Sequence, residues 1–355
     1  MTLAPQHRTV RVGEQAAAAS ERVLAHIERD GSGESDVVLL SARTRAHLLS
    51  VGYGDESDLS AGLAKLELAA TTLPSGHPGW GLSYAWDAFG DGTVNPPTTV
   101  YAYTTASAAL AFLDGYLALG DERWLDLAAA ACATIVTEMC CWRRDRYRSV
   151  WYSDQPADQQ DGYQVHNVSA LALAALTRLD RLRGERRLAR ERSGMLAYLL
   201  AKQGRGLDAA VPGLASNWRY MPGGSQANDL VHEAFIVMGL LEAGGRRALR
   251  AATASLRGML DVHFAADGAP REGHFTRGSN GWGPPAALFV LTGVPDFETA
   301  AARIASTLVR SVGDEGSTYA APDRVRGQAW YALGLARYAA LAAGRSEYLA
   351  GGLRA

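Results

Sequence analysis

Three residues in the stretch 229–233 have the types and the spacing of a proton-transfer group. Asp229, His232 and Glu233 are separated by three and four positions, so on a helix they share one face. Histidine titrates near neutral pH, and a neighbouring carboxylate can hold its ring in one orientation. The alternative is that Asp229 caps the helix and His232 is a satisfied buried histidine. We predict that Asp229 and His232 are catalytic.

Two further residues, His166 and Asp87, are candidates for acid–base chemistry. His166 and Asn167 begin a second apolar segment. Asp87 follows Trp86, and burial among aromatic side chains would raise its pKa, as a general acid requires. For His166 the alternative is a buried structural histidine, and for Asp87 it is a residue of the Gly-rich turn that follows it.

Sequence patterns typical of metal, nucleotide or nucleophile sites are missing. The His-Glu pair at 232–233 lacks the second histidine of a zinc-binding helix. Cys132, Cys140 and Cys141 match neither a zinc spacing nor a disulfide framework, and we interpret 140–141 as the frayed end of an outer helix. There is no phosphate-binding glycine loop and no GxSxG turn. We therefore expect a reaction that needs no cofactor and no metal.

Composition and charge narrow the class of protein. The 355 residues are 48% hydrophobic and 20% charged, with a net charge of −2, which is typical of a folded globular protein. The protein therefore lacks the excess of positive charge that is typical of proteins binding nucleic acid or an anionic membrane. No run approaches the 18 apolar residues of a membrane span, and no secretory signal is evident. We expect a cytoplasmic protein with a small-molecule or oligosaccharide substrate; the oligomeric state stays open.

Helical periodicity dominates the chain, and two kinds of helix alternate. Segments that are apolar nearly all round begin near Thr98, Val165, Asp229, Pro284 and Asp323. Amphipathic segments with one Arg/Glu face lie between them, at Arg123–Met139, Glu185–Lys202, Gly245–His263 and Asp296–Val312. Strand-like alternation is nearly absent, and Val37–Leu40 is too short to build a sheet. The sequence therefore predicts an all-α chain of inner and outer helices.

The repeat of helical hairpins predicts a closed ring. The spacing between inner helices varies, which argues against an open solenoid. Helices at Glu14–Asp30 and Leu59–Leu73 would complete the early hairpins, and Ser346–Arg354 could close the ring. We predict an (α/α)6 toroid that forms one domain over residues 1–355, with residues 1–13 as a flexible N-terminal extension.

Polar and aromatic residues gather where the inner helices begin, whereas the second half of each inner helix is expected to be plain core. The inner N-termini of a toroid open onto the same end, so these clusters should meet in one cleft. Tryptophan and tyrosine offer flat faces that suit sugar rings, and arginine suits a carboxylate. We predict that the cleft binds substrate through Trp86, Tyr152, Asp154, Asn167, Trp218, Tyr220, Arg277, Trp282 and Arg326.

The chain resembles the six-hairpin glycosidase-like superfamily over about residues 59–341. The resemblance lies in the stretches GWGLSYAWD at 79–87, PTTV at 97–100, VHNVSA at 165–170, NWRY at 217–220 and NDLVHEAFIVMGL at 228–240. Members have (α/α)6 barrels and include unsaturated uronyl hydrolases, glucuronyl C5-epimerases and N-acylglucosamine 2-epimerases. The resemblance implies that Asp87, His166, Asp229, His232 and Trp218 lie in the cleft. His166-Asn167 stands where an acidic residue would better suit a hydrolase.

These features favour an enzyme that acts on a sugar or a uronate-containing saccharide by acid–base catalysis, with hydrolysis ranked slightly above epimerisation or elimination. Two other classes stay open. A biosynthetic cyclase or isomerase could use the same cavity for an apolar substrate, which an aromatic pocket with few polar groups would favour. A non-catalytic saccharide-binding scaffold would bind sugar without turning it over.

Overall fold

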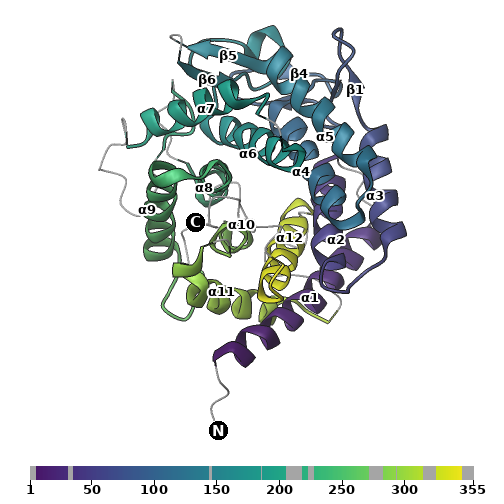
Figure 1. Ribbon diagram of the computed structural model, residues 1–355, viewed down its shortest axis with the longest axis vertical. Coiled ribbons are helices and arrows are strands. Elements are labelled where there is room, and N and C mark those ends of the chain that lie inside the picture. Colours follow the sequence, from purple (N-terminus) through teal and green to yellow (C-terminus); the bar gives the residue numbers. More distant parts are fainter. Residues whose placement is uncertain are drawn as a thin grey trace.

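Six inner helices form a closed ring (Figure 1). The computed structural model describes residues 5–30, 35–143, 146–184, 186–204, 218–222, 228–271, 283–292, 294–314 and 325–345. Within these residues each inner helix packs against the next, and the last returns to the first. The inner helices are α2 (Ser35–Leu49), α4 (Ala102–Leu119), α6 (His166–Arg183), α8 (Leu230–Ala243), α10 (Gly283–Leu291) and α12 (Val325–Ala342).

Each inner helix is covered by an outer helix (Figure 1). The outer layer consists of α1 (Pro5–Asp30), α3 (Glu56–Leu68), α5 (Glu122–Thr134), α7 (Ala189–Lys202), α9 (Gly245–His263) and α11 (Glu298–Ser311). Inner helices such as α6 are buried on nearly every side, whereas α9 buries one stripe and exposes an arginine-rich face. This difference in burial is the one that the two sequence patterns predicted. The all-α class and the (α/α)6 toroid are confirmed.

The ring closes through the first helix. Helix α1 lies along α12, and the Ser20 hydroxyl donates a hydrogen bond to the carbonyl oxygen of Ala332 at 2.7 Å. Residues 5–13, predicted as part of a flexible extension, form the first turns of helix α1. Ser346–Arg354, the segment expected to close the ring, lies outside the described residues.

The inner helix α2 is not among the helices predicted from the sequence. Val37–Leu40 belongs to α2, where it had been weighed only as a strand too short for a sheet. Arg43, Thr44 and His47 interrupt the apolar pattern of this helix, yet all three are buried. Their polar groups are accommodated by partners, as when the Thr44 hydroxyl donates to the carbonyl oxygen of Leu40 at 2.8 Å.

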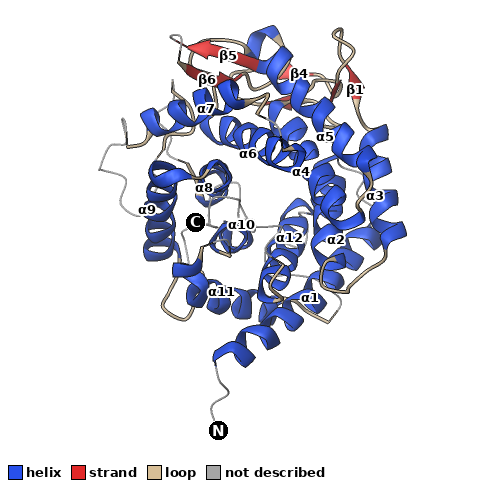
Figure 2. Ribbon diagram, in the orientation of Figure 1, coloured by secondary structure: helices blue, strands red, loops and turns tan. Residues whose placement is uncertain are grey.

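Besides the helices, the described residues form three small antiparallel hairpins (Figure 2). They pair β1 (Thr71–Thr72) with β2 (Pro78–Gly79), β3 (Trp86–Asp87) with β4 (Val94–Asn95), and β5 (Cys140–Arg143) with β6 (Tyr147–Val150). Helix α5 continues into a π-helical turn at Ile135–Met139 and then into β5. Cys140–Cys141 is therefore a strand paired with 149–150, and its interpretation as a frayed helix end was wrong.

The C-terminal halves of the inner helices carry a buried charge cluster rather than plain core, which corrects that expectation. Asp114 of α4 accepts Arg43 of α2 at 2.7 Å and also pairs with Arg178 of α6. Arg178 reaches Glu242 of α8 at 3.0 Å, and Arg337 of α12 donates to the carbonyl oxygen of Phe289 at 2.9 Å. Helix C-termini attract cations, which favours arginine at this end of the ring.

None of the described helices is both long enough and apolar enough to cross a bilayer.

Candidate active site at the inner-helix N-termini

The two predicted histidines lie on neighbouring inner helices and contact the same short segment, 218–220. His166 is the first residue of α6; its backbone N–H donates to the carbonyl oxygen of Tyr220 at 3.1 Å, and its ring Nδ1 lies 2.6 Å from that of Arg219. The ring of His232, in the first turn of α8, stands edge-on to the Tyr220 ring with centroids 5.1 Å apart. The ring fold thus brings together two histidines that are 66 positions apart in the sequence.

Asp229 and His232 form a dyad at the start of α8. The Asp229 Oδ1 atom accepts the backbone N–H of His232 at 3.0 Å and lies 2.8 Å from its Nδ1 atom. Asp229 is therefore both the helix cap of the alternative interpretation and the carboxylate that orients the imidazole. Because Nδ1 is bound to the carboxylate, Nε2 is the ring nitrogen left for a substrate. The His232 side chain is 32% exposed, so a substrate can reach it.

His166 is a buried neutral histidine. Burial lowers its pKa to about 4, against the opposing effect of the hydrogen bond to Arg219. Since a carbonyl oxygen can only accept, Nδ1 carries the proton and Nε2 presents a lone pair. That Nε2 atom is buried and has no hydrogen-bond partner among the described residues.

Two tyrosines lie beside the dyad. The Tyr220 hydroxyl is hydrogen-bonded to Tyr152, and its pKa is raised to about 12 by burial and by the nearby charge of Asp229. Burial and the surrounding tyrosines raise the pKa of Tyr152 well above its usual value. Both predicted residues therefore stay protonated across the physiological range and can donate hydrogen bonds.

Asp158 is a functional candidate that is not among the residues predicted from the sequence. It is 2% exposed, and its Oδ2 atom accepts hydrogen bonds from Asn95 at 2.7 Å and from Ser153 at 2.5 Å. Its negative charge contributes to the raised pKa values of Tyr101 and Tyr152. No periodicity in the sequence marks it, because it lies in a single 3-10 turn, Pro156–Asp158.

Asp87 and Asp154 both have local structural contacts. The two carboxylate oxygens of Asp87 accept the backbone N–H groups of Gly90 and Gly92, at 2.7 and 3.0 Å. These are the contacts of the turn residue that was weighed as its alternative. Asp154 accepts the backbone N–H of Val100 at 3.2 Å and the amide of Gln155 at 2.9 Å. The hydrogen bonds that these carboxylate oxygens accept do not indicate that either aspartate is available as a general acid.

The aromatic residues predicted to bind substrate differ in how deeply they are buried. Trp218 is fully buried and its indole donates to the carbonyl oxygen of Leu199 at 2.9 Å, so the prediction that it stacks on substrate was wrong. Trp86 is partly exposed and lies against Tyr84, whose hydroxyl accepts a 2.6 Å hydrogen bond from Arg326. Arg277 and Trp282 lie outside the described residues.

The barrel interior beneath His232 is aromatic. Phe235, one turn along α8, packs against Tyr103 of α4 and Trp330 of α12, with ring centroids 5.9 and 5.3 Å away. The Trp330 indole N–H is buried and has no partner within the described part of the chain. The surroundings of the dyad therefore combine aromatic rings with histidine, tyrosine and amide groups, which differs from the purely apolar lining expected for a cyclase.

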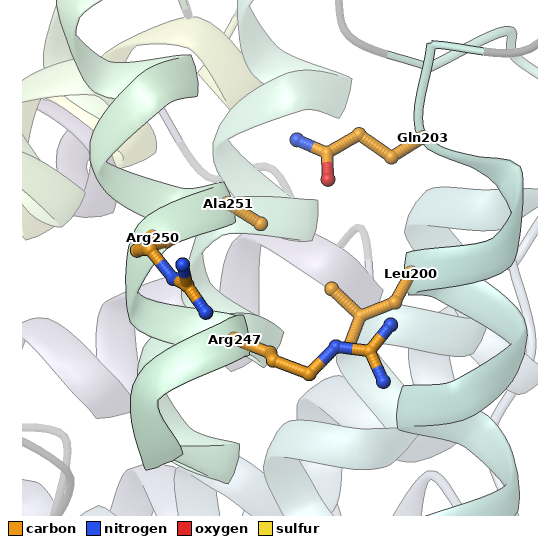
Figure 3. Close-up of a pocket in the computed structure, with 5 residues that line it drawn as sticks. All are labelled: Leu200, Gln203, Arg247, Arg250 and Ala251. Atoms are coloured by element: carbon orange, nitrogen blue, oxygen red, sulfur yellow. The ribbon is translucent and has the colours of Figure 1, made fainter.

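A hollow of about 250 Å³ lies elsewhere, between outer helices α7 and α9 (Figure 3). Leu200, Gln203, Arg247, Arg250 and Ala251 line it. The guanidinium of Arg247 extends across it toward Leu200 (Figure 3). It is separate from the histidines of α6 and α8, so we do not assign the proton chemistry to it.

Solved structures with the same architecture include a family 76 α-mannanase from Bacteroides thetaiotaomicron. It is 13% identical, with 92% of this chain and 95% of that chain covered and a TM-score of 0.68. This chain shares the (α/α)6 fold of these solved structures. No protein-family model matches it, and no curated protein matches it by sequence.

Two other similar folds have different activities in their names. An α-1,6-mannanase from Salegentibacter is 13% identical, covering 92% of this chain and 99% of that one with a TM-score of 0.62. A sugar epimerase from a ruminal bacterium is 12% identical, covering 84% of this chain and 87% of that one with a TM-score of 0.53. At these identities the likeness establishes the fold alone, and the chemistry must come from the site.

Proposed function

We propose that the protein is a carbohydrate-active enzyme that moves a proton at a sugar carbon, with the His232–Asp229 dyad as the base. The 2.8 Å contact between Asp229 Oδ1 and His232 Nδ1 carries this proposal. A carboxylate in this position orients the imidazole and stabilises the imidazolium that forms when Nε2 takes a proton. The reaction class that follows is epimerisation or isomerisation of a reducing sugar.

The proposed step uses groups that are already in place. Nε2 of His232 removes the proton from the carbon next to the carbonyl of the open-chain sugar, and the C–H electron pair becomes that of an enediolate. Tyr152 and Tyr220 are both protonated and hydrogen-bonded to each other, so the pair supplies one remaining hydroxyl donor beside the dyad, that of Tyr220, for the developing oxyanion. The enediolate then turns so that its other face meets the His232 imidazolium, which returns the proton to the carbon and gives the epimer.

His166 would bind substrate rather than start the reaction. Its Nε2 atom can accept a hydrogen bond from a sugar hydroxyl, because Nδ1–H is occupied by Arg219. Its lowered pKa makes it a weak base compared with an imidazole that is paired with a carboxylate.

The hydroxyl, imidazole and aromatic groups around the dyad, and the names of similar solved structures, support a saccharide substrate. One similar structure is an α-1,6-mannanase variant in complex with α-1,6-mannotetrose, and another is a cellobiose 2-epimerase. That mannanase variant is inactive with two consecutive aspartates replaced by alanine. The present sequence contains no two adjacent aspartates, so a hydrolase here would need different carboxylates.

Glycoside hydrolysis is the second candidate, because two carboxylates flank the tyrosine pair. Asp158 affects the pKa of Tyr152, and Asp229 affects that of Tyr220. Hydrolysis by the usual route needs two carboxyl groups about 5 to 9.5 Å apart on either side of the scissile bond. In that case Asp158→Asn would abolish the release of mannose from α-1,6-mannotetrose.

The test compares sugar interconversion by the native protein and three variants, with glucose, mannose and cellobiose as substrates. We expect His232→Gln and Asp229→Asn to lower kcat by about 10² or more, as removal of an acid–base group does. His26→Gln, on outer helix α1, is the control and should keep native rates. Equal rates for His232→Gln and the control would overturn the proposal, and cleavage without epimer would replace it by hydrolysis.

A further inference from the structure

Asn228 is a buried amide whose side chain has no hydrogen-bond partner in the part of the chain that the structure describes. It precedes the dyad residue Asp229, is 2% exposed, and its backbone N–H donates to the carbonyl oxygen of Trp218 at 3.3 Å. Neither Oδ1 nor Nδ2 has a partner among the described residues. An unpartnered buried polar atom costs about 1–3 kcal/mol, so an amide left in this state is costly for folding.

Two other unpartnered acceptors lie at the same end of the ring. They are Oδ1 of Asn167 and Nε2 of His166, on residues that are 3% and 2% exposed. The segment 218–220 connects the groups, because Trp218 accepts a hydrogen bond from Asn228 while Arg219 and Tyr220 accept from His166. Three neighbouring side chains thus have hydrogen-bonding atoms for which the described residues provide no partner.

The chemistry of these atoms indicates which ligand would use them. An amide presents one acceptor and one pair of donors side by side. Two adjacent hydroxyl groups match this pattern, since one can donate to Oδ1 while the oxygen of the other accepts from Nδ2. Asn167 Oδ1 and His166 Nε2 add two acceptors for further hydroxyl protons. A carboxylate or phosphate, which only accepts, would leave these acceptors unpaired.

We propose that Asn228 is a specificity residue that recognises two adjacent free hydroxyl groups of a neutral sugar, with Asn167 and His166 completing the subsite. The inference rests on the proposed function for the identity of the substrate as a saccharide. It deepens that function by assigning a role to a residue outside the proton-transfer dyad.

The first test measures binding by calorimetry, with mannose, cellobiose and the monodeoxy mannoses as probes. We expect native protein to bind mannose or cellobiose at least 10-fold more tightly than Asn228→Leu does. At least one monodeoxy mannose should bind the native protein 5-fold or more weakly than mannose, and Asn228→Leu should lose that discrimination. Equal affinities of native and variant protein, or no binding of either sugar to the native protein, would overturn the proposal.

The second test measures the melting temperature and needs no ligand. Because the Asn228 amide has no partner among the residues that the structure describes, Asn228→Leu should keep or raise the native melting temperature. Asn95→Leu is the matched control, since Asn95 is equally buried and donates to Asp158, so its loss should lower the melting temperature by several degrees. A similar fall for Asn228→Leu would show that the amide serves the fold, and would contradict the proposal.

The proposed proton transfer and the proposed Asn228 subsite can be disproved separately. If mannose binds and Asn228→Leu abolishes the discrimination, but no sugar is interconverted, the proton-transfer function is wrong and the subsite stands. If sugars are interconverted and Asn228→Leu retains native discrimination against deoxy sugars, the function stands and the subsite is wrong.

Discussion

At the scale of single residues, His166 links the site to the stability of the fold. Burial lowers its pKa to about 4, whereas an exposed histidine titrates near 6.5. The unfolded chain therefore binds a proton below about pH 6.5 that the folded chain does not take up until about pH 4. Stability is complete above pH 6.5 and is lost as the pH falls toward 4.

His166→Asn tests this linkage, because the asparagine amide can still donate to the carbonyl oxygen of Arg219. The native protein should lose about 3 kcal/mol of unfolding free energy between pH 7 and pH 4 through this one group. The variant should lose correspondingly less, measured by urea unfolding at both values. His47, with a pKa of about 3, contributes equally to both proteins and cancels in the difference. An identical pH dependence for the two proteins would contradict the assignment of a neutral buried His166.

From the sequence, we could predict that a residue lies at the start of an inner helix. We could not predict which atoms its side chain contacts. His166, Asp229, His232, Tyr152 and Tyr220 were predicted from their positions at helix starts, and the fold brings them together. Trp218 carries the same signal as a stacking residue, yet its ring fills the core. The buried carboxylate of Asp158 accepts hydrogen bonds from Asn95 and Ser153. Such contacts cannot be predicted from a local sequence pattern.

At the scale of helices, close approach of α6 and α8 sets the positions of the two histidines. A Cβ atom at Gly239 of α8 would meet the carbonyl oxygen of Ala170 in α6 well inside van der Waals contact. The absence of a side chain there lets the two helices pack closely. Gly62 of outer helix α3 has room for a Cβ atom, whose nearest neighbour would be 3.9 Å away.

Gly239→Ala and Gly62→Ala therefore form a matched pair with opposite effects. Gly239→Ala should lower the unfolding free energy by about 1–3 kcal/mol, because the helices must separate. Gly62→Ala should raise it by about 0.5–1 kcal/mol through helix propensity. Thermal and urea unfolding measure both. The geometry would be wrong if Gly239→Ala proved as stabilising as Gly62→Ala.

The helix pattern predicted the bounds of several helices but missed the inner helix α2. The start or end of α6, α8, α9 and α11 falls within a few residues of the prediction. Helix α2 escaped detection because Arg43 and His47 break its apolar pattern, and only the distant Asp114 makes that arginine tolerable inside the ring. The pairing of β5 with β6 could not be predicted from the sequence either, because four-residue strands carry almost no periodicity.

At the scale of the whole molecule, the buried charge cluster connects inner helices that are distant in sequence. Asp114 binds Arg43 and Arg178, and Glu242 binds Arg178 and Arg181, so one cluster joins α2, α4, α6 and α8. The arginines hold the pKa of Asp114 well below its usual range despite its burial. The cluster lies away from the proton-transfer dyad and serves the closed ring.

Asp114→Asn should destabilise the ring by about 3–5 kcal/mol, because it leaves buried guanidinium groups without their counter-charge. Asp126→Asn is the control, since Asp126 pairs with Arg183 at the surface and its loss should cost about 1 kcal/mol or less. Unfolding in guanidinium chloride measures both variants. Equal and small effects would show that the buried cluster contributes no more than a surface ion pair.

The most direct test of the account is solvent exchange at the reacting carbon. Native protein is incubated with mannose in deuterium oxide, and the recovered sugar is examined by NMR for deuterium at the carbon next to the carbonyl. The account predicts deuterium at that carbon together with the epimeric sugar, and loss of both with His232→Gln. A sugar recovered without deuterium from the native protein, or unchanged deuterium incorporation by His232→Gln, would contradict the claim that the His232–Asp229 dyad transfers the proton.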